Sequence, residues 1–374
     1  MHSALPSLFL SAIRGAGIAL LIAAAPVSAE SLAPRITHAA VVLPSGQVFV
    51  TGGSHFEIGA LRSSQIYDPQ TRDWYTSEPL GTSRSGHTAT LLPSGKVLVA
   101  GGSMSSASAE LYDPATGSWT PTGPMTAVRW GHTATLLDSG KVLVVGGGNN
   151  STSHATAELY DPATSTWTAA ASLNGAPREY HTATLLPSGK VLVAGGWNAD
   201  NGSLSQCEIY DPILNTWSPT GAIVGARSTH TATLLPSGKV LVVGGFQFDW
   251  LWTASEYDPA TGSWSAVAQM PNMLMGHQAI LLASGDVLVT NVADRRAALL
   301  YHPATQSWSP TASLLQPRWR HSATLLPSGR VLVAGGSKTY SLLPLGTTEE
   351  YDPATATWSD ADLVFADTFD GFAH

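Results

Sequence analysis

The chain of 374 residues contains one cysteine, Cys207. A disulfide within the chain is therefore excluded, even in an oxidising compartment. Cys207 stands where alanine precedes glutamate in the other copies of a recurring AELY pattern. That position favours a small buried residue, and a reactive thiol is the alternative.

Charge is also scarce, since charged residues make up 12% of the chain and the net charge is −8. Proteins that bind nucleic acid through its phosphates need a concentrated basic surface. This composition does not provide one. We therefore expect no nucleic-acid partner.

Long apolar runs are missing except near the amino terminus. Residues 1–29 hold no acidic residue, one arginine, the run GIALLIAAA and then Val27-Ser28-Ala29. This arrangement is typical of a secretory signal peptide cleaved after Ala29. An uncleaved anchor is the alternative, although the apolar run is short for a bilayer. We expect an extracytoplasmic protein, periplasmic or secreted, with no membrane span after cleavage.

The chain is rich in one repeated stretch. Its clearest copy covers residues 84–119 and reads RSGHTATLLPSGKVLVAGG, then a variable run, then AELYDPATGSW. Seven copies follow one another at intervals of 44 to 49 residues. Each is marked by one histidine: His38, His87, His132, His181, His230, His277 and His321. A period of this length indicates a propeller or a linear array.

Spacing within the repeat separates constant from variable parts. The marker histidine lies 14 positions before the first residue of the glycine pair, and the tyrosine of YDP lies 7 before the tryptophan. Between the glycine pair and the tyrosine the distance ranges from 10 to 16. HTATLL and KVLVAG read as one hairpin, and the segments flanking DPATGS read as another. Four antiparallel strands per repeat, here named a to d, predict one propeller blade.

The glycine pair, the tyrosine and tryptophan seven apart, and an arginine three before the histidine together resemble the kelch repeat over residues 35–358. The resemblance implies an all-β, seven-bladed kelch-type β-propeller in residues 30–362, followed by a tail at 363–374. We expect a monomer whose ring closes by packing blade seven on blade one without exchanging strands. Kelch proteins include binding modules and a few enzymes, so the fold does not define the function.

The sixth copy departs from this pattern. Asn291 and Val292 replace the glycines, Leu274 replaces the arginine, and His302 replaces the aspartate of YDP. We interpret it as a degenerate blade. The marker histidines themselves begin strand a in each blade, which predicts seven separate blade interfaces and no shared metal site. We expect neither a metal nor another cofactor.

The candidate ligand site lies where the repeat varies. The b-to-c loops vary in length and emerge on the same face as the d-to-a connections, and such insertions commonly mark a binding face. This face holds every tryptophan outside the seven structural ones. The predicted ligand-binding aromatic residues are Trp130, Tyr180, Trp197, Trp250, Trp252 and Trp319, with Phe56, Phe246, Phe248 and Tyr340 in the same loops. For the 246–252 segment, a local hydrophobic cluster is the alternative.

The repeated arginines extend this prediction. A ring of them near the channel mouth would attract anions. The predicted ligand-binding arginines are Arg84, Arg129, Arg178, Arg227 and Arg318. Their constant position also suits a structural role, in which each binds carbonyls or an acidic side chain of a neighbouring blade. The favoured function is a binding module for a glycan or surface polymer, with a protein ligand as the other option.

An enzyme is the alternative function. REYHTATLLPSGKVLVAGGW resembles a segment of the galactose oxidase and glyoxal oxidase group, which implies copper ligands at Tyr180 and His181 with Trp197 nearby. Cys207 lies outside the cysteine's place in that group, and no extra domain supplies the last histidine. Periplasmic sialic acid mutarotases are a second kelch-type comparison, for which Glu179 is the candidate carboxylate. We therefore favour a binding module over an enzyme.

Overall fold

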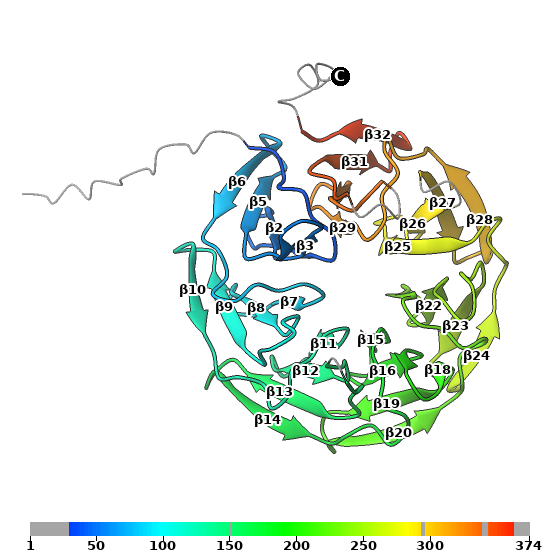
Figure 1. Ribbon diagram of the computed structural model, residues 1–374. Helices are drawn as coiled ribbons and strands as arrows, with labels where there is room; N and C mark the ends of the chain where they lie inside the picture. The colour runs from blue at the N-terminus through cyan, green and yellow to red at the C-terminus, as the bar shows by residue number, and fades with distance from the viewer. Residues whose placement is uncertain (1–29, 150, 293–295, 339–342, 363–374) are drawn as a thin grey trace, which may run out of the picture.

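The fold is a ring of seven four-stranded blades around a central channel (Figure 1). The computed structural model describes residues 30–149, 151–292, 296–338 and 343–362. Those residues contain only strands, turns and loops. The predicted seven-bladed β-propeller is confirmed. The predicted signal peptide and the tail at 363–374 lie outside the described residues.

Each blade is a continuous piece of chain. Blades one to three consist of β1 (Ala39–Val42), β2 (Val48–Thr51), β5 (Ser64–Asp68), β6 (Asp73–Ser77); β7 (Thr88–Leu91), β8 (Val97–Ala100), β9 (Ala109–Asp113), β10 (Ser118–Pro121); and β11 (Thr133–Leu136), β12 (Val142–Val145), β13 (Ala157–Asp161), β14 (Thr166–Ala170). Blades four and five consist of β15 (Thr182–Leu185), β16 (Val191–Ala194), β19 (Cys207–Asp211), β20 (Thr216–Thr220); and β21 (Thr231–Leu234), β22 (Val240–Val243), β23 (Ala254–Asp258), β24 (Ser263–Ala266). Blades six and seven consist of β25 (Leu274–Leu281), β26 (Val287–Val292), β27 (Ala297–His302), β28 (Ser307–Thr311); and β29 (Ser322–Leu325), β30 (Val331–Ala334), β31 (Thr348–Asp352), β32 (Thr357–Asp360).

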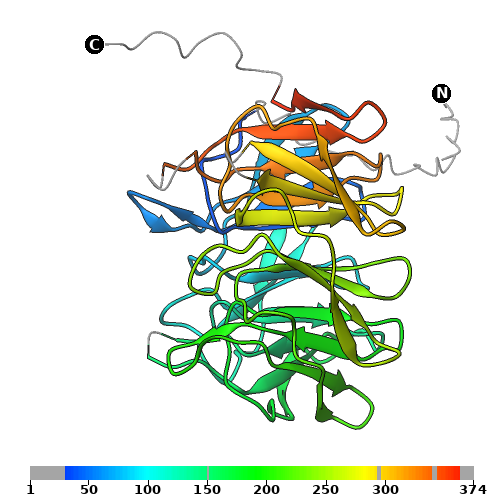
Figure 2. The same cartoon turned by 90° about the vertical axis from the view of Figure 1, so that its right-hand side faces the viewer.

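Two b-to-c loops carry small hairpins of their own. These are β3 (Ser54–His55) with β4 (Gly59–Ala60), and β17 (Trp197–Asn198) with β18 (Gly202–Ser203). Seen from the side, the β3/β4 hairpin projects from one face of the ring (Figure 2). Short bridges join each d-to-a connection to the start of its b-to-c loop, as between Trp130 and Gly148. The two kinds of connection therefore share one face, as predicted.

Strand b is buried along its whole length in blades one to five and seven, because both faces of a blade pack against its neighbours. The core therefore consists of separate clusters between blades. Between blades two and three, for example, Leu98 and Ala100 pack with Val142, Val144 and Tyr160. The tyrosine and tryptophan of each blade pack with their rings tilted by 42° to 51° and their centroids 4.9 to 5.2 Å apart.

Strand a runs along the channel, and β1 contacts both β7 and β29. The marker histidine before each strand a reaches back to the preceding blade. The Nε2 atom of His132 lies 3.1 Å from the hydroxyl of Thr88, and that of His181 lies 3.0 Å from the hydroxyl of Thr133. The histidines therefore lie at separate blade interfaces, as the repeat predicted.

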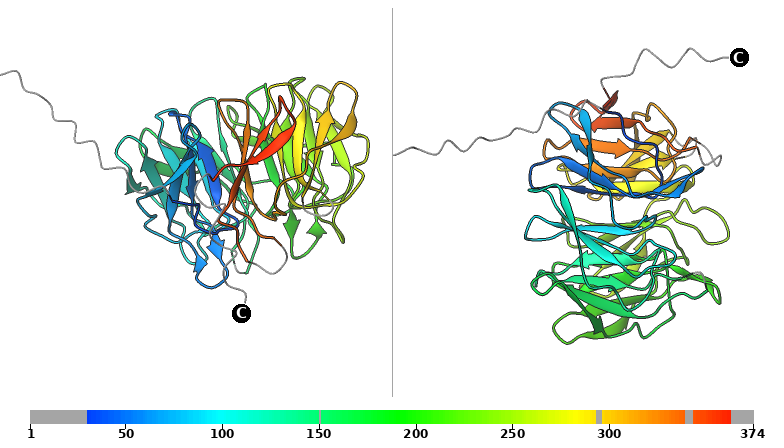
Figure 3. Two further views of the ribbon diagram at one scale, coloured as in Figure 1. Left: turned by 90° about the horizontal axis from the view of Figure 1, so that it is seen from above. Right: turned by 60° about the vertical axis from the view of Figure 1, so that its left-hand side comes forward.

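The ring closes by packing blade seven on blade one, and the strand order of both blades shows no exchange. Tyr67 donates a hydrogen bond of 2.7 Å to Glu350, and the indole of Trp74 donates one of 3.2 Å to Asp362. Trp119 makes the equivalent bond to the carbonyl of Glu78. The closing junction therefore repeats the contacts of an ordinary junction, and the ring seen edge on is a thick disc (Figure 3).

Blade six is irregular where the repeat is lost. Its first strand, β25, begins at Leu274 and contains a register shift between Leu274 and Gln278. Leu274 replaces the repeated arginine and is fully buried. The degenerate repeat thus still forms a four-stranded blade.

Among the described residues, the structure contains no helix with the length and apolar character needed to cross a membrane.

Candidate functional site

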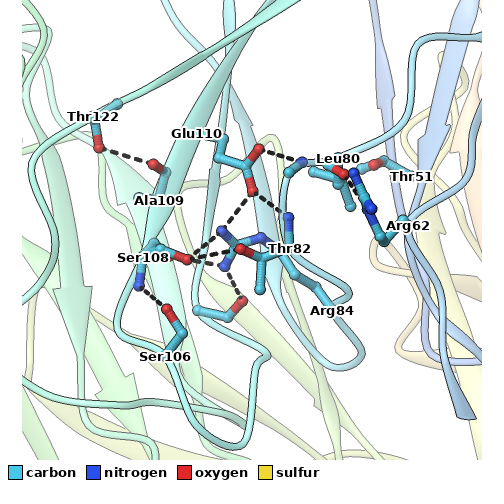
Figure 4. Close-up of polar contacts among 12 residues, drawn as sticks. Thr51, Arg62, Leu80, Thr82, Arg84, Ser106, Ser108, Ala109, Glu110 and Thr122 are labelled. Atoms are coloured by element: carbon cyan, nitrogen blue, oxygen red, sulfur yellow. Dashed lines mark hydrogen bonds and ion pairs between the residues drawn. The ribbon is translucent and has the colours of Figure 1, made fainter.

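The repeated arginines are buried in the scaffold, and Figure 4 shows the polar contacts of one of them, Arg84. Arg84 donates from Nη1 to the carbonyls of Gly101 and Ser108, each at 2.8 Å, and from Nη2 to Glu110 at 2.8 Å. Glu110 also accepts bonds from backbone N–H groups of the d-to-a connection, including that of Thr82. Gly101 and Ser108 are the two ends of the b-to-c loop of blade two. Each arginine of this kind therefore clamps both ends of a variable loop.

The same clamp recurs around the ring and corrects one sequence prediction. The side chains are fully buried, with no exposed surface, in Arg35, Arg84, Arg129, Arg178, Arg227 and Arg318. Their guanidinium groups are held by carbonyls and carboxylates of their own blade, not of a neighbouring one. The prediction that Arg84, Arg129, Arg178, Arg227 and Arg318 bind ligand is therefore replaced by a structural role.

Burial weakens the affinity of Arg35 and Arg227 for their protons without removing their charge at neutral pH. It lowers the pKa of Arg35 and of Arg227 to about 10. In both blades the usual acidic partner is missing: Gln65 and Ser255 stand where Glu110 stands in blade two. The loop clamp thus persists without the ion pair, because the carbonyl contacts remain.

A ring of seven residues, each directly before a marker histidine, surrounds the channel on the b-to-c loop face. We call it the mouth ring; it consists of Thr37, Gly86, Gly131, Tyr180, Thr229, Gly276 and Arg320. All seven have left-handed backbone, with φ between 52° and 65°. Such a conformation costs a residue other than glycine about 1 to 2 kcal/mol. The four residues with side chains are therefore held there by their surroundings.

Backbone hydrogen bonds link the mouth ring from blade to blade. The N–H of Tyr180 donates to the carbonyl of Gly131 at 2.8 Å, and that of Thr229 donates to the carbonyl of Tyr180 at 3.0 Å. Equivalent bonds join Thr37 to Arg320, Gly86 to Thr37 and Arg320 to Gly276. This ladder fixes the left-handed conformations. It also gives the channel mouth a rigid rim.

Two large side chains rise from the mouth ring, and each lies against a tryptophan. Tyr180 packs edge on against Trp130 with ring centroids 5.4 Å apart. The guanidinium carbon of Arg320 lies 4.2 Å from the centre of the Trp319 ring. Tyr180 and Arg320 are both exposed. We call these four residues the mouth cluster; it brings together three of the predicted ligand-binding residues and adds Arg320.

Tyr180 of blade four and Arg320 of blade seven interact electrostatically. Burial raises the pKa of Tyr180, with a further increase from Glu179, while Arg320 acts in the opposite direction. Burial lowers the pKa of Arg320, and Tyr180 opposes that change. Arg320 makes no ion pair with any residue in the described ranges. Its cationic head is therefore open to a ligand.

The sequence analysis did not select Arg320, although a signal was present. In five other blades the residue before the histidine is glycine or threonine. Arginine at such a position is a departure from the repeat, as is Tyr180. The arginine that reaches the surface is Arg320, whereas the repeated arginine two positions earlier, Arg318, is buried.

The other predicted aromatic residues do not form one surface with the mouth cluster. Trp250 packs edge on against Phe246 with ring centroids 5.3 Å apart, which is the local cluster considered above. A turn in which Gln247 N–H donates to the Asp249 carbonyl separates Phe246 from Trp250, so the 246–252 segment is not extended throughout. Trp252 is 49% exposed and its carbonyl is bound by the N–H of Met270.

Two further residues of the predicted loops are Trp197 and Tyr340. Trp197 is half-buried and pairs through its backbone with Glu179. Tyr340 lies outside the described residues.

Glu179, the candidate for acid/base chemistry, lies in the wall beneath the mouth and not on its surface. It is 4% exposed, and Ser153 donates a hydrogen bond of 2.9 Å to its Oε1 atom. Burial raises its pKa. A substrate at the mouth would meet Tyr180 and Trp130 first, so this carboxylate does not support a mutarotase-like reaction in the conformation described.

The residues that the oxidase resemblance would assign to copper do not converge. His181 is buried, and its Nε2 atom is engaged with Thr133. Cys207 is 2% exposed on β19, where it packs with Leu186 and Leu192, and burial raises the pKa of its thiol to about 11. The described residues contain no group of three His, Cys, Asp or Glu side chains placed to hold a metal. The donor set present therefore does not fit a copper-radical centre.

Two polar grooves open on the opposite face, where the a-to-b and c-to-d turns lie. One of about 510 Å³ follows the junction of blades seven and one and is lined by Arg72, Arg330 and Glu350 among others. The second, of about 380 Å³, lies between blades five and six beside Lys239 and Glu256. In both grooves the carboxylate accepts a hydrogen bond from a tyrosine of the next blade. These grooves are accounted for by contacts between blades.

Comparison with known proteins agrees with this architecture. Residues 86–290, more than half of the chain, match the KLHDC2/KLHL20/DRC7 Kelch-repeats domain. The chain belongs to the kelch-repeat family. No curated protein sequence matches this kelch protein. Among solved structures it is similar to a fungal alcohol oxidase of the AA5 family in complex with copper, with a TM-score of 0.72, 19% identity, and coverage of 88% of this chain and 78% of the oxidase. At that identity the similarity shows the fold alone.

Proposed function

We propose that this kelch protein is an extracytoplasmic binding propeller whose ligand, a glycan or another surface polymer, docks on the mouth cluster. The observation that carries the proposal is the gathering of Trp130, Tyr180 and Trp319 with the unpaired guanidinium of Arg320 at one rigid rim. Exposed aromatic rings are costly in water unless they bind something. Sugar rings present flat apolar faces that stack on such side chains.

The polar groups at the mouth suit a ligand that is rich in hydroxyl or anionic groups. The hydroxyl of Tyr180 both donates and accepts hydrogen bonds, whereas Arg320 only donates. The arginine clamps below hold the loop ends in place, so little conformational freedom is lost when a ligand binds. Pre-organisation of this kind supports binding, because less conformational entropy is lost when the ligand docks.

The proposal is tested by replacing Tyr180 with glycine, which tolerates left-handed backbone and already occupies three positions of the mouth ring. A screen of immobilised glycans and surface polymers would compare wild type, Tyr180→Gly and Arg320→Gly. Loss of a stacked ring should weaken binding by about 5- to 150-fold, which is the ~1 to 3 kcal/mol measured for rings stacked on nucleic-acid bases. The melting temperature should change little, because glycine relieves backbone strain.

Thr229→Gly is the matched control, since it changes the same backbone position in blade five and removes no aromatic ring. It should bind like wild type. Equal binding by Tyr180→Gly, Arg320→Gly and Thr229→Gly to every hit would overturn the proposal. Trp252→Ala reports whether the ligand extends across the blade-five loop.

The alternative, a carbohydrate-active oxidase, is tested separately. Copper-loaded protein would be assayed for peroxide production from alcohols and aldehydes. Production that is abolished by Tyr180→Phe would establish the oxidase and replace the binding proposal.

A further inference from the structure

Blade six reverses a charge pair that blades two to five and seven keep. In blades two to four a lysine after the a-to-b turn pairs with the aspartate of YDP, as Lys96 does with Asp113 at 3.0 Å. In blade six the lysine position holds Asp286 and the aspartate position holds His302. The two are paired at 2.9 Å through the Nδ1 atom of His302. Reversal therefore puts an imidazole where a carboxylate usually lies.

The reversed pair continues into a chain of three hydrogen bonds. Ser284 donates to Oδ2 of Asp286 at 3.0 Å, and Oδ1 of Asp286 faces Nδ1 of His302. The Nε2 atom of His302 lies 2.8 Å from the hydroxyl of Ser309 on β28. An ionised carboxylate only accepts hydrogen bonds, so the proton of a neutral His302 ring must be on Nδ1. Nε2 is then left with its lone pair directed at the hydroxyl of Ser309.

We propose that Ser309 is an activated nucleophile, with His302 as its general base and Asp286 as the residue that orients the imidazole. The three side chains have the order and distances that activate serine in unrelated acyl-transfer enzymes. Of these three residues, Asp286 and His302 are specific to blade six, whereas serine also stands at the position of Ser309 in blades four, five and seven.

The reaction is acyl transfer from an activated ester to Ser309. The Oγ atom attacks the acyl carbonyl carbon while its proton passes to Nε2 of His302. The bond to the leaving oxygen then breaks, and the alcohol or phenol departs with the proton from His302. Water can repeat the sequence to release the carboxylic acid, so the balance requires no further reactant.

The surroundings restrict the donor. The side chains of His302 and Asp286 are 33% and 29% exposed, and Ser309 is half-buried, so a small reagent has access. The two grooves described above are lined by other residues. Since neither groove would hold a substrate against Ser309, the site suits small activated acyl donors and not amides.

The repeat supplies an internal control for the nucleophile. Ser218 on β20 lies in the same four-residue sequence, WSPT, as Ser309 and follows the same strand position in blade four. Its neighbours are the ordinary ion pair of Lys190 and Asp211. Ser218 is the more exposed of the two serines. If exposure alone set the rate of acetylation, Ser218 would therefore react faster. Activation by a general base predicts the opposite, with Ser309 reacting faster.

The experiment treats the full protein with p-nitrophenyl acetate and measures acetylation of individual serines by peptide mass spectrometry. A positioned general base contributes about 10²- to 10⁴-fold to such reactions. We therefore expect Ser309 to be acetylated at least tenfold faster than Ser218. His302→Gln should remove that advantage, and Ser309→Ala should abolish the fast phase of p-nitrophenolate release.

The double variant Asp286→Lys with His302→Asp restores the charge pair of the other blades. It should fold with an unchanged melting temperature and should acetylate Ser309 no faster than Ser218. The double variant therefore removes the general base while the blade stays folded, so a slower reaction cannot be attributed to unfolding. Equal rates at Ser309 and Ser218 in wild type, or an undiminished rate at Ser309 in this folded double variant, would overturn the proposal.

Discussion

Arg84 illustrates how one side chain can hold a variable loop at both ends. Its guanidinium bonds the carbonyls of Gly101 and Ser108, which begin and end the loop, so the loop between them can change in length without moving its base. The planar fork of arginine matches several acceptors at once, whereas lysine presents a single ammonium group. This geometry favours arginine over lysine at the position.

Replacement of Arg84 by lysine should therefore lower the free energy of unfolding by about 2 to 4 kcal/mol, because buried acceptors and the carboxylate of Glu110 lose partners. Arg62→Lys is the control. Arg62 is exposed and makes one backbone bond, so its replacement should cost at most about 0.5 kcal/mol. Urea unfolding measures both. Similar stabilities for the two variants would contradict the clamp.

Spacing alone placed the arginines correctly but left their role open. A ligand-binding arginine and a loop-clamping arginine can stand at the same point of a repeat, and only burial distinguishes them. Tyr180 and Arg320 show the converse: they depart from the repeat, and both reach the surface. Departure from the repeat was thus the better signal of an exposed site than membership of it.

At the scale of the strand, the contact between a marker histidine and the preceding strand a depends on one hydroxyl. Thr88 provides it for His132, and Ser322 provides it for His38. In blade one the equivalent position is Ala39, so His87 has no hydroxyl partner there. The design differs at two interfaces: the hydroxyl is missing between blades one and two, and between blades six and seven His321 pairs with Thr290 of β26.

Ala39→Ser should supply that group and raise the free energy of unfolding by about 1 kcal/mol, the usual net value of one hydrogen bond. Thr88→Ala should lower it by a similar or larger amount, since it leaves His132 without its hydroxyl partner. Thermal or urea unfolding of the two variants tests the pair. A destabilised Ala39→Ser would show that the site has no room for the added oxygen.

Strand positions were predictable because alternation, glycine turns and the YDP motif are local. The path of the loop containing Trp250 and Trp252 could not be predicted, because it depends on a turn at Gln247 and on packing against Phe246. Propensity describes a strand well and an irregular loop poorly. The mouth cluster could not be predicted from local sequence either, since it joins blades that are far apart in the sequence.

For the whole molecule, the marker histidines together determine how stability depends on pH. Burial lowers the pKa to about 3 in His87, His132, His230 and His321, and to about 4 in His277. The unfolded chain binds a proton on each of them near pH 6.5, whereas the folded chain does not until the pH reaches those lower values. The stability is thus complete above about pH 6.5 and is lost as the pH falls.

Each such histidine should contribute about 1.4 kcal/mol per pH unit over this range, so five or more acting together should unfold the ring cooperatively between about pH 6 and pH 4. Urea unfolding at a series of pH values measures the slope. His230→Gln should reduce it by about one proton. A midpoint that stays constant from pH 7 to pH 4 would contradict the burial of neutral histidines.

The backbone ladder of the mouth ring has one further consequence. Its N–H groups all donate in the same rotational sense around the channel, as from Tyr180 to Gly131 and from Thr229 to Tyr180. Peptide dipoles arranged head to tail around a circle cancel as vectors, whereas those of a helix add along its axis. The components of these peptide dipoles in the plane of the rim therefore largely cancel. The side chains then largely set the sign of the potential that an approaching ligand meets, and on a protein of net charge −8 Arg320 contributes a positive charge at the mouth.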